Sequence, residues 1–242
     1  AADDLKILRL ELGGKAPFIV GEDADIGAAV KAAVASRFEN CGQICICNER
    51  MYVHERIADE FTEKFVRAVK GLKVGDPLQT VDVGPKFSAA ELDKVERMVQ
   101  AATAAGAKVL TGGKRLTDGE FAKGHWFEPT VLTAADNRMA IMQDEVFGPV
   151  IPLMTVTDFD EGLRLANESR YGLSAYVFTK DMRRLMRLVR ELKFGEIYVN
   201  RPGGDAVHAH HAGLRHSGIG GEDGKYGLDA YFQKKTIYVN YA

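Results

Sequence analysis

Residues 10–20 read Leu-Glu-Leu-Gly-Gly-Lys-Ala-Pro-Phe-Ile-Val, and this stretch decides how the chain is expected to fold. Leu5–Leu12 alternates in part between apolar and polar residues, which predicts a strand with Glu11 near its end. The two glycines permit a sharp turn of the backbone. The apolar run Ala16–Val20 then predicts a second strand. Glu11 is therefore expected at a strand end, which is where ligands usually bind in an α/β sheet.

Helices and strands are predicted to alternate along the rest of the chain. Apolar spacing and capping residues predict helices, whereas short apolar runs predict strands. Alternation of this kind favours parallel β-α-β units, so the expected fold is α/β with a parallel sheet. The glycine-rich segment Ser217–Gly221 does not sit at a strand-to-helix turn and is expected to be a loop. The expected helices are 25–38, 58–72, 88–105 and 182–192, and the further strands are 51–53, 108–110, 173–178, 196–199 and 236–240.

Composition argues against several classes of protein. The chain has 242 residues and a net charge of −2 with both signs interspersed, so neither a nucleic-acid nor a membrane partner is expected. No apolar run approaches the roughly 18 residues that a membrane helix needs. No signal peptide is visible. Three cysteines fall within residues 41–47, which is a poor disulfide framework and favours a reducing, cytoplasmic setting.

Residues 38–45, Phe-Glu-Asn-Cys-Gly-Gln-Ile-Cys, place cysteines just beyond a predicted helix. Gly42 suits a turn there, and a cysteine on such a turn can be an exposed nucleophile. Its thiolate would need a lowered pKa or a nearby base. The same pattern allows three small buried apolar residues instead. It also allows a compact metal site, although no fourth ligand is near and the spacing matches no common zinc site.

Two glutamates could take part in chemistry. If Glu11 lies near apolar neighbours, its pKa would rise and it could act as a base near neutral pH. The plain alternative is an ordinary exposed glutamate. Residues 144–150, Asp-Glu-Val-Phe-Gly-Pro-Val, predict a loop that enters a strand. The two carboxylates of this loop could bind ribose hydroxyls or could simply be solvated.

Taken together, these motifs resemble the aldehyde dehydrogenase superfamily. Leu10–Pro17 and Phe38–Glu49 are similar to its two active-site signatures, in the right order and with Cys45 34 positions after Glu11. Glu145–Pro149 resembles a third marker, and the resemblance extends through nearly the whole chain. Residues 210–221 are most similar to the lactaldehyde and glycolaldehyde dehydrogenases of bacteria, with enzymes acting on succinate semialdehyde close by.

The resemblance implies a role for particular residues. Cys45 would attack an aldehyde to give a thiohemiacetal, hydride would pass to NAD or NADP, and Glu11 would activate the water that hydrolyses the resulting thioester. Glu145 would hold the nicotinamide ribose, Phe147 would be the aromatic residue beside it, and Lys94 falls near a position that also reaches this ribose.

A substrate role is implied for two residues of the loop 201–211. Asp205 and His211 would hydrogen-bond a hydroxyl group on a small hydroxyaldehyde, and the alternative is a solvated histidine-rich loop. The apolar residue Ile46 stands where some hydroxyaldehyde enzymes have a polar one, which departs from the lactaldehyde pattern.

The resemblance also implies that this sequence is the catalytic half of a longer enzyme. Related enzymes are about twice this length, and most of their cofactor fold precedes the glutamate motif. Residues 1–225 are expected to form the catalytic domain, and residues 226–242 a segment whose strand at 236–240 joins an oligomerisation sheet. The N-terminal cofactor-binding half is absent from this sequence, and a homo-oligomer, dimer or tetramer, is expected.

Two other functions compete with this one. A cysteine hydrolase or acyltransferase would pair Cys45 with a histidine base and would use no nucleotide. A non-catalytic assembly fragment would use neither Glu11 nor Cys45.

Overall fold

A seven-stranded sheet forms the centre of the computed structural model, which describes residues 3–134, 136–204 and 206–242. Its strands are β2 (Ala16–Val20), β3 (Asn48–His54), β4 (Val109–Thr111), β7 (Thr130–Thr133), β8 (Val150–Val156), β10 (Ser174–Phe178) and β11 (Glu196–Val199). They lie in the order β11-β10-β2-β3-β8-β7-β4, and only β7 and β4 pair antiparallel. The expected α/β class is confirmed, with a parallel sheet that turns antiparallel at one edge.

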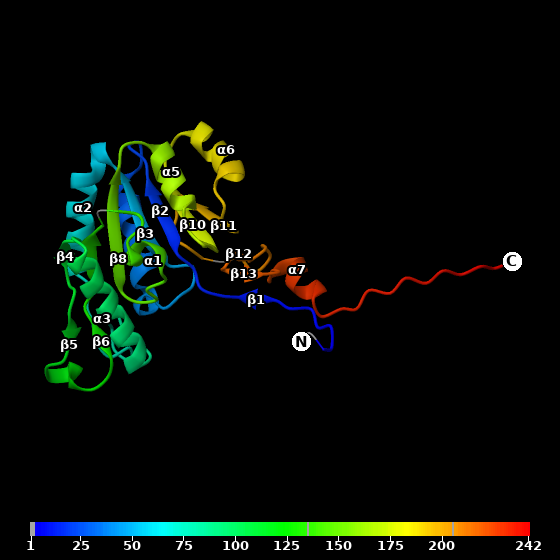
Figure 1. Ribbon diagram of the computed structural model, residues 1–242, viewed down its shortest axis with the longest axis horizontal. Helices are drawn as coiled ribbons and strands as arrows, with labels where there is room; N and C mark the ends of the chain where they lie inside the picture. Colours follow the sequence, from blue (N-terminus) through cyan, green and yellow to red (C-terminus); the bar gives the residue numbers. More distant parts are fainter. Residues whose placement is uncertain (1–2, 135, 205) are drawn as a thin grey trace.

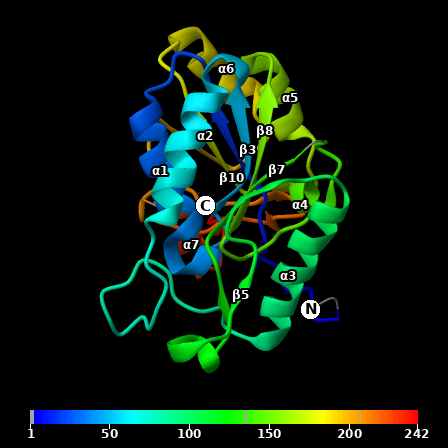
Figure 2. The same cartoon turned by 90° about the vertical axis from the view of Figure 1, so that its left-hand side faces the viewer.

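Helices cover both faces of this sheet (Figures 1 and 2). The helices are α1 (Ile26–Phe38), α2 (Glu55–Lys70), α3 (Ala89–Ala104), α4 (Ala140–Gln143), α5 (Phe159–Asn167), α6 (Met182–Glu191) and α7 (Gly224–Asp229). Side chains of α1 and α2 share one core with Phe18 and Val20, whereas those of α3 and α5 share the other with Ile19. Successive residues of a strand point to opposite faces, so the apolar run of β2 serves both cores.

Capping residues place the helix ends close to where the sequence predicted them. Asp25 accepts a hydrogen bond from the amide of Ala28 at 2.9 Å, and Ser88 accepts one from the amide of Glu91 at 3.3 Å. These bonds satisfy backbone donors that the first turn of a helix leaves unpaired. β3 begins three residues earlier than expected, because Asn48, Glu49 and Arg50 are buried within it rather than exposed before it.

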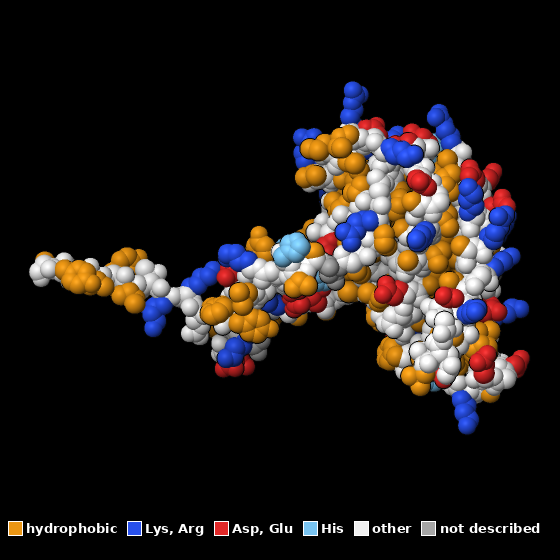
Figure 3. Space-filling model, turned by 180° about the vertical axis from the view of Figure 1, so that it is seen from behind, with side chains coloured by type: hydrophobic (Ala, Val, Ile, Leu, Met, Phe, Trp, Pro, Cys, Tyr) orange, Lys and Arg blue, Asp and Glu red, His pale blue; other side chains and the backbone are white. Residues whose placement is uncertain are grey.

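Two expectations, about the start of the chain and the glycine-rich segment, are wrong. The predicted strand Leu5–Leu12 shrinks to β1 (Leu10–Glu11). Residues 236–240 form no strand within the single chain, and their role as an oligomerisation strand stays a prediction. An extended segment becomes a strand only when another strand accepts its hydrogen bonds, and Ile7 and Tyr238 are 90% and 93% exposed. The C-terminal residues stand clear of the body with apolar side chains along them (Figures 1 and 3). Conversely, Gly218–Ile219 is not a loop but forms β13, which pairs antiparallel with β1.

Small elements complete the structure. Three two-stranded sheets pair β1 with β13, β9 with β12 and β5 with β6. The division of the chain at residues 225 and 226 stays a prediction. Across the part of the chain that the structure describes, no helix is both long and apolar enough to cross a membrane. The bounds are β5 (Arg115–Leu116), β6 (Trp126–Phe127), β9 (Tyr171–Gly172), β12 (Leu214–Arg215), and the 3₁₀ helices Glu39–Gly42 and Gly119–Ala122.

The apolar core beneath α2 should contribute strongly to the free energy of unfolding. Phe65 is fully buried and stacks on Phe61 with ring centroids 5.8 Å apart. Phe65→Ala should lower the free energy of unfolding by about 3–5 kcal/mol, because it removes buried area and leaves a cavity. Urea unfolding followed by circular dichroism measures the change. The control Phe232→Ala removes a ring that is 66% exposed and should cost less than about 0.5 kcal/mol. Equal losses in the two variants would contradict the core assignment.

Candidate active site

Cys45 lies on a turn between α1 and β3. The chain reverses after α1 through Asn40, Cys41 and Gly42, whose φ angles are 48°, 59° and 68°. Asparagine and glycine adopt left-handed backbone more readily than other residues, but cysteine rarely does, so the surrounding contacts must hold Cys41 in this conformation. A hydrogen bond from the amide of Cys47 to the carbonyl of Ile44, 3.1 Å long, then closes the turn that carries Cys45.

The three cysteines differ in exposure. Cys41 and Cys47 are buried, and Cys45 is half-buried, so the interpretation as small buried residues is right for only two of them. Burial raises the pKa of each buried thiol to about 11, which keeps both protonated at neutral pH. Within the described residues, no group of three or more His, Cys, Asp and Glu side chains is placed to hold a metal ion. Cys45 is therefore the accessible thiol of the three.

Buried polar contacts hold the Cys45 turn in place. Arg37 donates to the carbonyl oxygens of Gly42 at 2.6 Å and Asn48 at 2.9 Å, which lie on either side of the turn. On the other side, the carbonyl oxygen of Ile46 accepts a hydrogen bond from the Tyr176 hydroxyl at 2.7 Å. It accepts a second from the hydroxyl of Ser174 at 3.1 Å. The turn is thus bonded to α1 and to β10 and cannot shift independently of the sheet.

Glycines let the three sequence motifs touch. A Cβ atom at Gly14 would lie 2.4 Å from the carbonyl oxygen of Cys45, and one at Gly13 would lie 2.2 Å from the Glu145 carboxylate. Both distances are far below van der Waals contact, so any side chain would push the motifs apart. The amide of Gly14 also donates to Glu145 Oε1 at 2.9 Å. The glycine pair after Glu11 therefore brings the nucleophile candidate and the Glu145 loop to one place.

Glu49 bonds the Glu145 loop to the sheet. Its carboxylate accepts hydrogen bonds from the amides of Val146 at 2.8 Å and Phe147 at 2.9 Å. It also pairs with Lys15 at 2.8 Å and Arg37 at 3.1 Å, and all three charged side chains are buried. Glu49 falls within the cysteine motif, but the motif alone assigned it no role. The polar run Asn-Glu-Arg at 48–50, directly before an apolar strand, was the available signal for a buried network.

The electrostatics at Cys45 favour a thiol that needs a base. Burial raises its pKa, and the nearby charge of Glu11 raises it further. The backbone amides of Cys45 and Ile46 act in the opposite direction but do not reverse the shift. Of the two activation routes that the sequence left open, this direction of the thiol pKa favours a nearby base.

Glu11 lies among polar partners. Its Oε2 atom is 3.0 Å from Nε2 of His211, and its Oε1 atom accepts a hydrogen bond from the amide of Gly213 at 3.4 Å. The apolar surroundings that would raise the pKa of this carboxylate are not what the structure shows, because pairing of β1 with β13 places Glu11 beside the loop that carries His211. Glu11 and Cys45 are close enough for the carboxylate charge to act on the thiol.

The expected cofactor residues surround the same place. Phe147 has a φ of 52°, and its carbonyl oxygen accepts a hydrogen bond from the buried Lys86. Burial raises the pKa of the Glu145 carboxyl, as does the charge of Glu49, and the charge of Lys94 opposes them. Lys94 is on α3 and pairs with Glu91 at 3.6 Å. The sequence pattern around Lys86 did not single it out.

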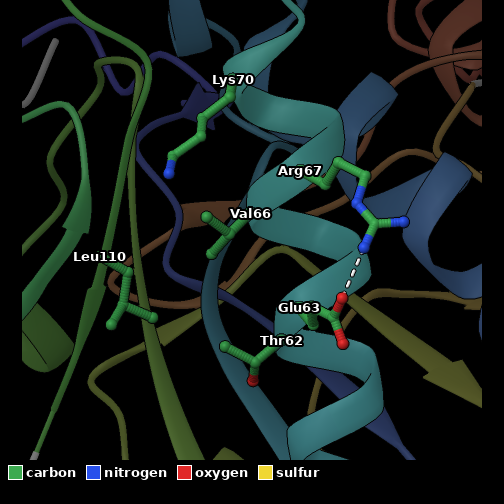
Figure 4. Close-up of a pocket in the computed structure, with 6 residues that line it drawn as sticks. All are labelled: Thr62, Glu63, Val66, Arg67, Lys70 and Leu110. Atoms are coloured by element: carbon green, nitrogen blue, oxygen red, sulfur yellow. Dashed lines mark hydrogen bonds and ion pairs between the residues drawn. The ribbon is translucent and has the colours of Figure 1, made fainter.

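Of the two expected substrate residues, His211 lies at the site through its contact with Glu11, and Asp205 lies outside the described residues. A separate hollow of about 400 Å³ beside α2 contains none of the predicted site residues (Figure 4). The ion pair of Glu63 with Arg67 runs along its wall. The hollow is lined by Thr62, Glu63, Val66, Arg67, Lys70 and Leu110.

Removing the charge of Glu49 should destabilise the protein in a pH-dependent way. Burial by itself would raise its pKa, but the charges of Lys15 and Arg37 and the hydrogen bonds to it lower the pKa to about 2. Glu49→Gln should lower the free energy of unfolding at pH 7 by about 3 kcal/mol or more, because two buried cations lose their partner. Urea unfolding at several pH values measures this.

The pH dependence has a definite sign. A carboxyl with a pKa lowered from 4.5 to about 2 contributes stability above pH 4.5 that is lost as the pH falls toward 2. The difference in free energy of unfolding between wild type and Glu49→Gln should therefore become smaller as the pH falls from 4.5 toward 2. Glu63→Gln, which alters an exposed ion pair, is the control and should cost less than about 1 kcal/mol. A gap that stays constant down to pH 2 would rule out the lowered pKa.

Comparison with known proteins identifies the family of the chain. The model of the aldehyde dehydrogenase family matches residues 1–237. The chain is 50% identical over 242 residues to 3,6-anhydro-alpha-L-galactose dehydrogenase of Vibrio sp. (strain EJY3), covering 100% of this chain and 50% of that protein. It is 42% identical over 241 residues to lactaldehyde dehydrogenase of Escherichia coli (strain K12), covering 99% of this chain and 50% of that protein.

A solved structure gives the same result. The structure of 3,6-anhydro-L-galactose dehydrogenase in complex with NAP superposes with a TM-score of 0.97 at 52% identity, over 99% of this chain and 50% of that one. The chain thus spans about half the length of the curated relatives that it matches. Because the family model covers nearly all of the sequence, the chain belongs to the aldehyde dehydrogenase family.

Proposed function

We propose that the protein containing this chain oxidises a small hydroxyaldehyde to a carboxylic acid, with NAD or NADP as the hydride acceptor. One observation carries the proposal: Gly13 and Gly14 bring the Cys45 turn and the Glu145 carboxylate together directly after Glu11. The site thus holds a thiol, a carboxylate whose charge acts on that thiol, and a second carboxylate on a bonded loop.

The proposed reaction begins and ends with proton transfer to Glu11. Cys45 is a thiol at neutral pH, so Glu11 takes its proton as the sulfur attacks the aldehyde carbon. The backbone amide of Cys45 then donates to the oxyanion of the thiohemiacetal. Loss of hydride to the nicotinamide gives a thioester on Cys45. Glu11 releases the thiol proton to solvent and, ionised again, removes a proton from the water that attacks this thioester. The C–S bond then breaks and the carboxylic acid leaves.

The residues at the Glu145 loop fit the ribose of a nicotinamide cofactor, whose chemistry is to accept the hydride. The absence of a side chain at Gly13 leaves space at the Glu145 carboxylate, which can accept hydrogen bonds from ribose hydroxyls. Phe147 follows two residues later, on a loop that Glu49 and Lys86 hold through its backbone. Lys94 stays the weakest of the three assignments, because it pairs with Glu91.

The wider setting is part of the proposal. A homo-oligomer is supported by apolar residues exposed near the C-terminus, including Ile237 and Tyr238 at 74% and 93%. Three free cysteines support a reducing, cytoplasmic location. The hydroxyaldehyde class is supported by relatives whose names include lactaldehyde and anhydrogalactose dehydrogenases. His211, which contacts Glu11, and Asp205 are the residues that we propose to bind the substrate hydroxyl.

The nucleophile and base can be tested without a cofactor. The protein as its gene encodes it is incubated with an activated acyl ester, and intact mass reports each adduct. We expect one adduct on Cys45, none in Cys45→Ala, and a lifetime at least about tenfold longer in Glu11→Gln, because general-base assistance is lost. Cys47→Ala, which alters a buried thiol, is the matched control and should acylate normally. An adduct shared equally by Cys41, Cys45 and Cys47 would refute the assignment.

Cofactor affinity tests the Glu145 loop. Calorimetric titration with NAD and NADP should show weak binding or none to residues 1–242 alone, because only the Glu145 loop and Lys94 are expected to contact the cofactor. In the protein as its gene encodes it, Glu145→Gln should raise the dissociation constant about tenfold, which corresponds to one charged hydrogen bond. The control Glu60→Gln changes an exposed residue of α2 and should leave binding unchanged. Efficient NAD-dependent aldehyde oxidation by residues 1–242 alone would disprove the proposal that most cofactor contacts lie outside these residues.

A further inference from the structure

We propose that His211, oriented by Glu196, receives the proton that Glu11 takes from water and so restores Glu11 as a base. This inference rests on the proposed function, because it assigns the next step for a proton that the reaction delivers to Glu11. Glu196 and His211 are then positioning residues that act through Glu11.

A continuous set of hydrogen-bonding contacts connects these residues. Nε2 of His211 lies 3.0 Å from Glu11 Oε2, and Nδ1 of His211 lies 2.7 Å from Glu196 Oε1. The other oxygen of Glu196 accepts a hydrogen bond from the Tyr198 hydroxyl at 2.6 Å. Tyr198 and Glu196 lie on the same face of β11, two residues apart. The carboxylate of Glu196 is therefore fixed by the sheet before it meets the imidazole.

The set is largely shielded from solvent. The side chains of His211, Glu196 and Glu11 are 13%, 14% and 26% exposed. Charges in such a position are screened less than those of a surface ion pair. The backbone of His211 is held as well, because it exchanges hydrogen bonds with Glu222 at 3.2 Å and 2.7 Å across β-bridge geometry. The imidazole thus has little freedom to turn away from the two carboxylates.

Counting protons shows what this arrangement can do. Two ionised carboxylates only accept hydrogen bonds, and a neutral imidazole has one N–H group. Both contacts of His211 can be hydrogen bonds only when the three groups share one more proton. With the N–H at Nδ1 directed to Glu196, the lone pair at Nε2 faces Glu11. A carboxylate that fixes one ring nitrogen in this way makes the other a better proton acceptor.

The proposed step balances as follows. Water forms a C–O bond to the thioester carbon and gives a proton to Glu11, and the C–S bond breaks to leave the Cys45 thiolate. The O–H bond of protonated Glu11 then breaks, and the proton binds Nε2 of His211. The resulting imidazolium lies between two carboxylates, which stabilise its charge. Because its side chain is 13% exposed, His211 can then release the proton to solvent.

A role in substrate recognition makes a different prediction. If His211 only binds a hydroxyl group of the aldehyde, its loss weakens substrate affinity and has no effect on an acyl group without a hydroxyl. Hydrolysis of an acetyl group from Cys45 therefore separates the two roles. It also needs neither aldehyde nor cofactor.

The test follows acetyl-Cys45 by intact mass in the protein as its gene encodes it, after a pulse of an activated acetyl ester. His211→Ala should slow loss of the adduct at least about tenfold, with Glu196→Gln intermediate, whereas the yield of adduct stays unchanged. The double variant Glu11→Gln, His211→Ala should be no slower than Glu11→Gln, because His211 acts through Glu11. Added imidazole should restore the rate of deacetylation in His211→Ala. Imidazole would not repair a merely structural defect.

Each outcome decides between the inference and the proposed function. The exposed His216 supplies the matched control, and His216→Ala should deacetylate like wild type. Wild-type rates in both His211→Ala and Glu196→Gln, with normal acetylation of Cys45, would overturn the inference and leave the proposed function intact. Failure of wild-type protein to acetylate at Cys45 would overturn both. If His211→Ala does not fold, His211→Asn provides the same comparison, with a polar side chain that is shorter than histidine.

Discussion

The buried carboxylate of Glu49 is the interaction on which the site depends. It pairs with Lys15 and Arg37 and accepts two backbone hydrogen bonds from the Glu145 loop. A buried charge costs several kcal/mol unless its partners stay in place, so the native state needs all of these contacts together. Arg37 in turn bonds both sides of the Cys45 turn. One anion thus couples α1, β3 and two loops that are about a hundred residues apart in sequence.

Close packing of glycines adds precision that charge alone does not supply. Gly14 touches the carbonyl of Cys45, Gly13 touches Glu145, and a Cβ atom at Gly42 would lie 2.4 Å from the carbonyl oxygen of Gly148. At Gly14 and Gly42 a second backbone segment, and at Gly13 the carboxylate of Glu145, approaches more closely than a side chain on the glycine would permit. The motifs are therefore glycine-rich because they touch one another, and each motif needs the others to explain its composition.

Selectivity among the three cysteines also comes from this packing. All three thiols have raised pKa values, so none is activated by its own environment. Only Cys45 combines partial exposure with a carboxylate whose charge reaches it. Reactivity would then depend on Glu11, and the contacts of Glu11 with His211 and Gly213 determine how that carboxylate is presented. The chemistry at Cys45 would thus depend on Glu11 of β1 and on the contacts that the loop after β11 makes with it.

Periodicity and capping residues by themselves determined most of the regular elements, because a helix or a buried strand is specified by its own residues. They specified α1, α3, α6 and β11 within about a residue, and the resemblance of the motifs to the aldehyde dehydrogenase superfamily pointed to Cys45, Glu11 and Glu145. The tertiary structure alone decided the features that depend on contacts between residues distant in sequence. The strands expected at 5–12 and 236–240 shortened or did not form for lack of a paired strand, and Gly218–Ile219 became one by pairing with β1. Glu49, Lys86 and Glu196 gained their roles in the same way, because a buried charge or a hydrogen bond has meaning only when its partner, distant in sequence, is in place.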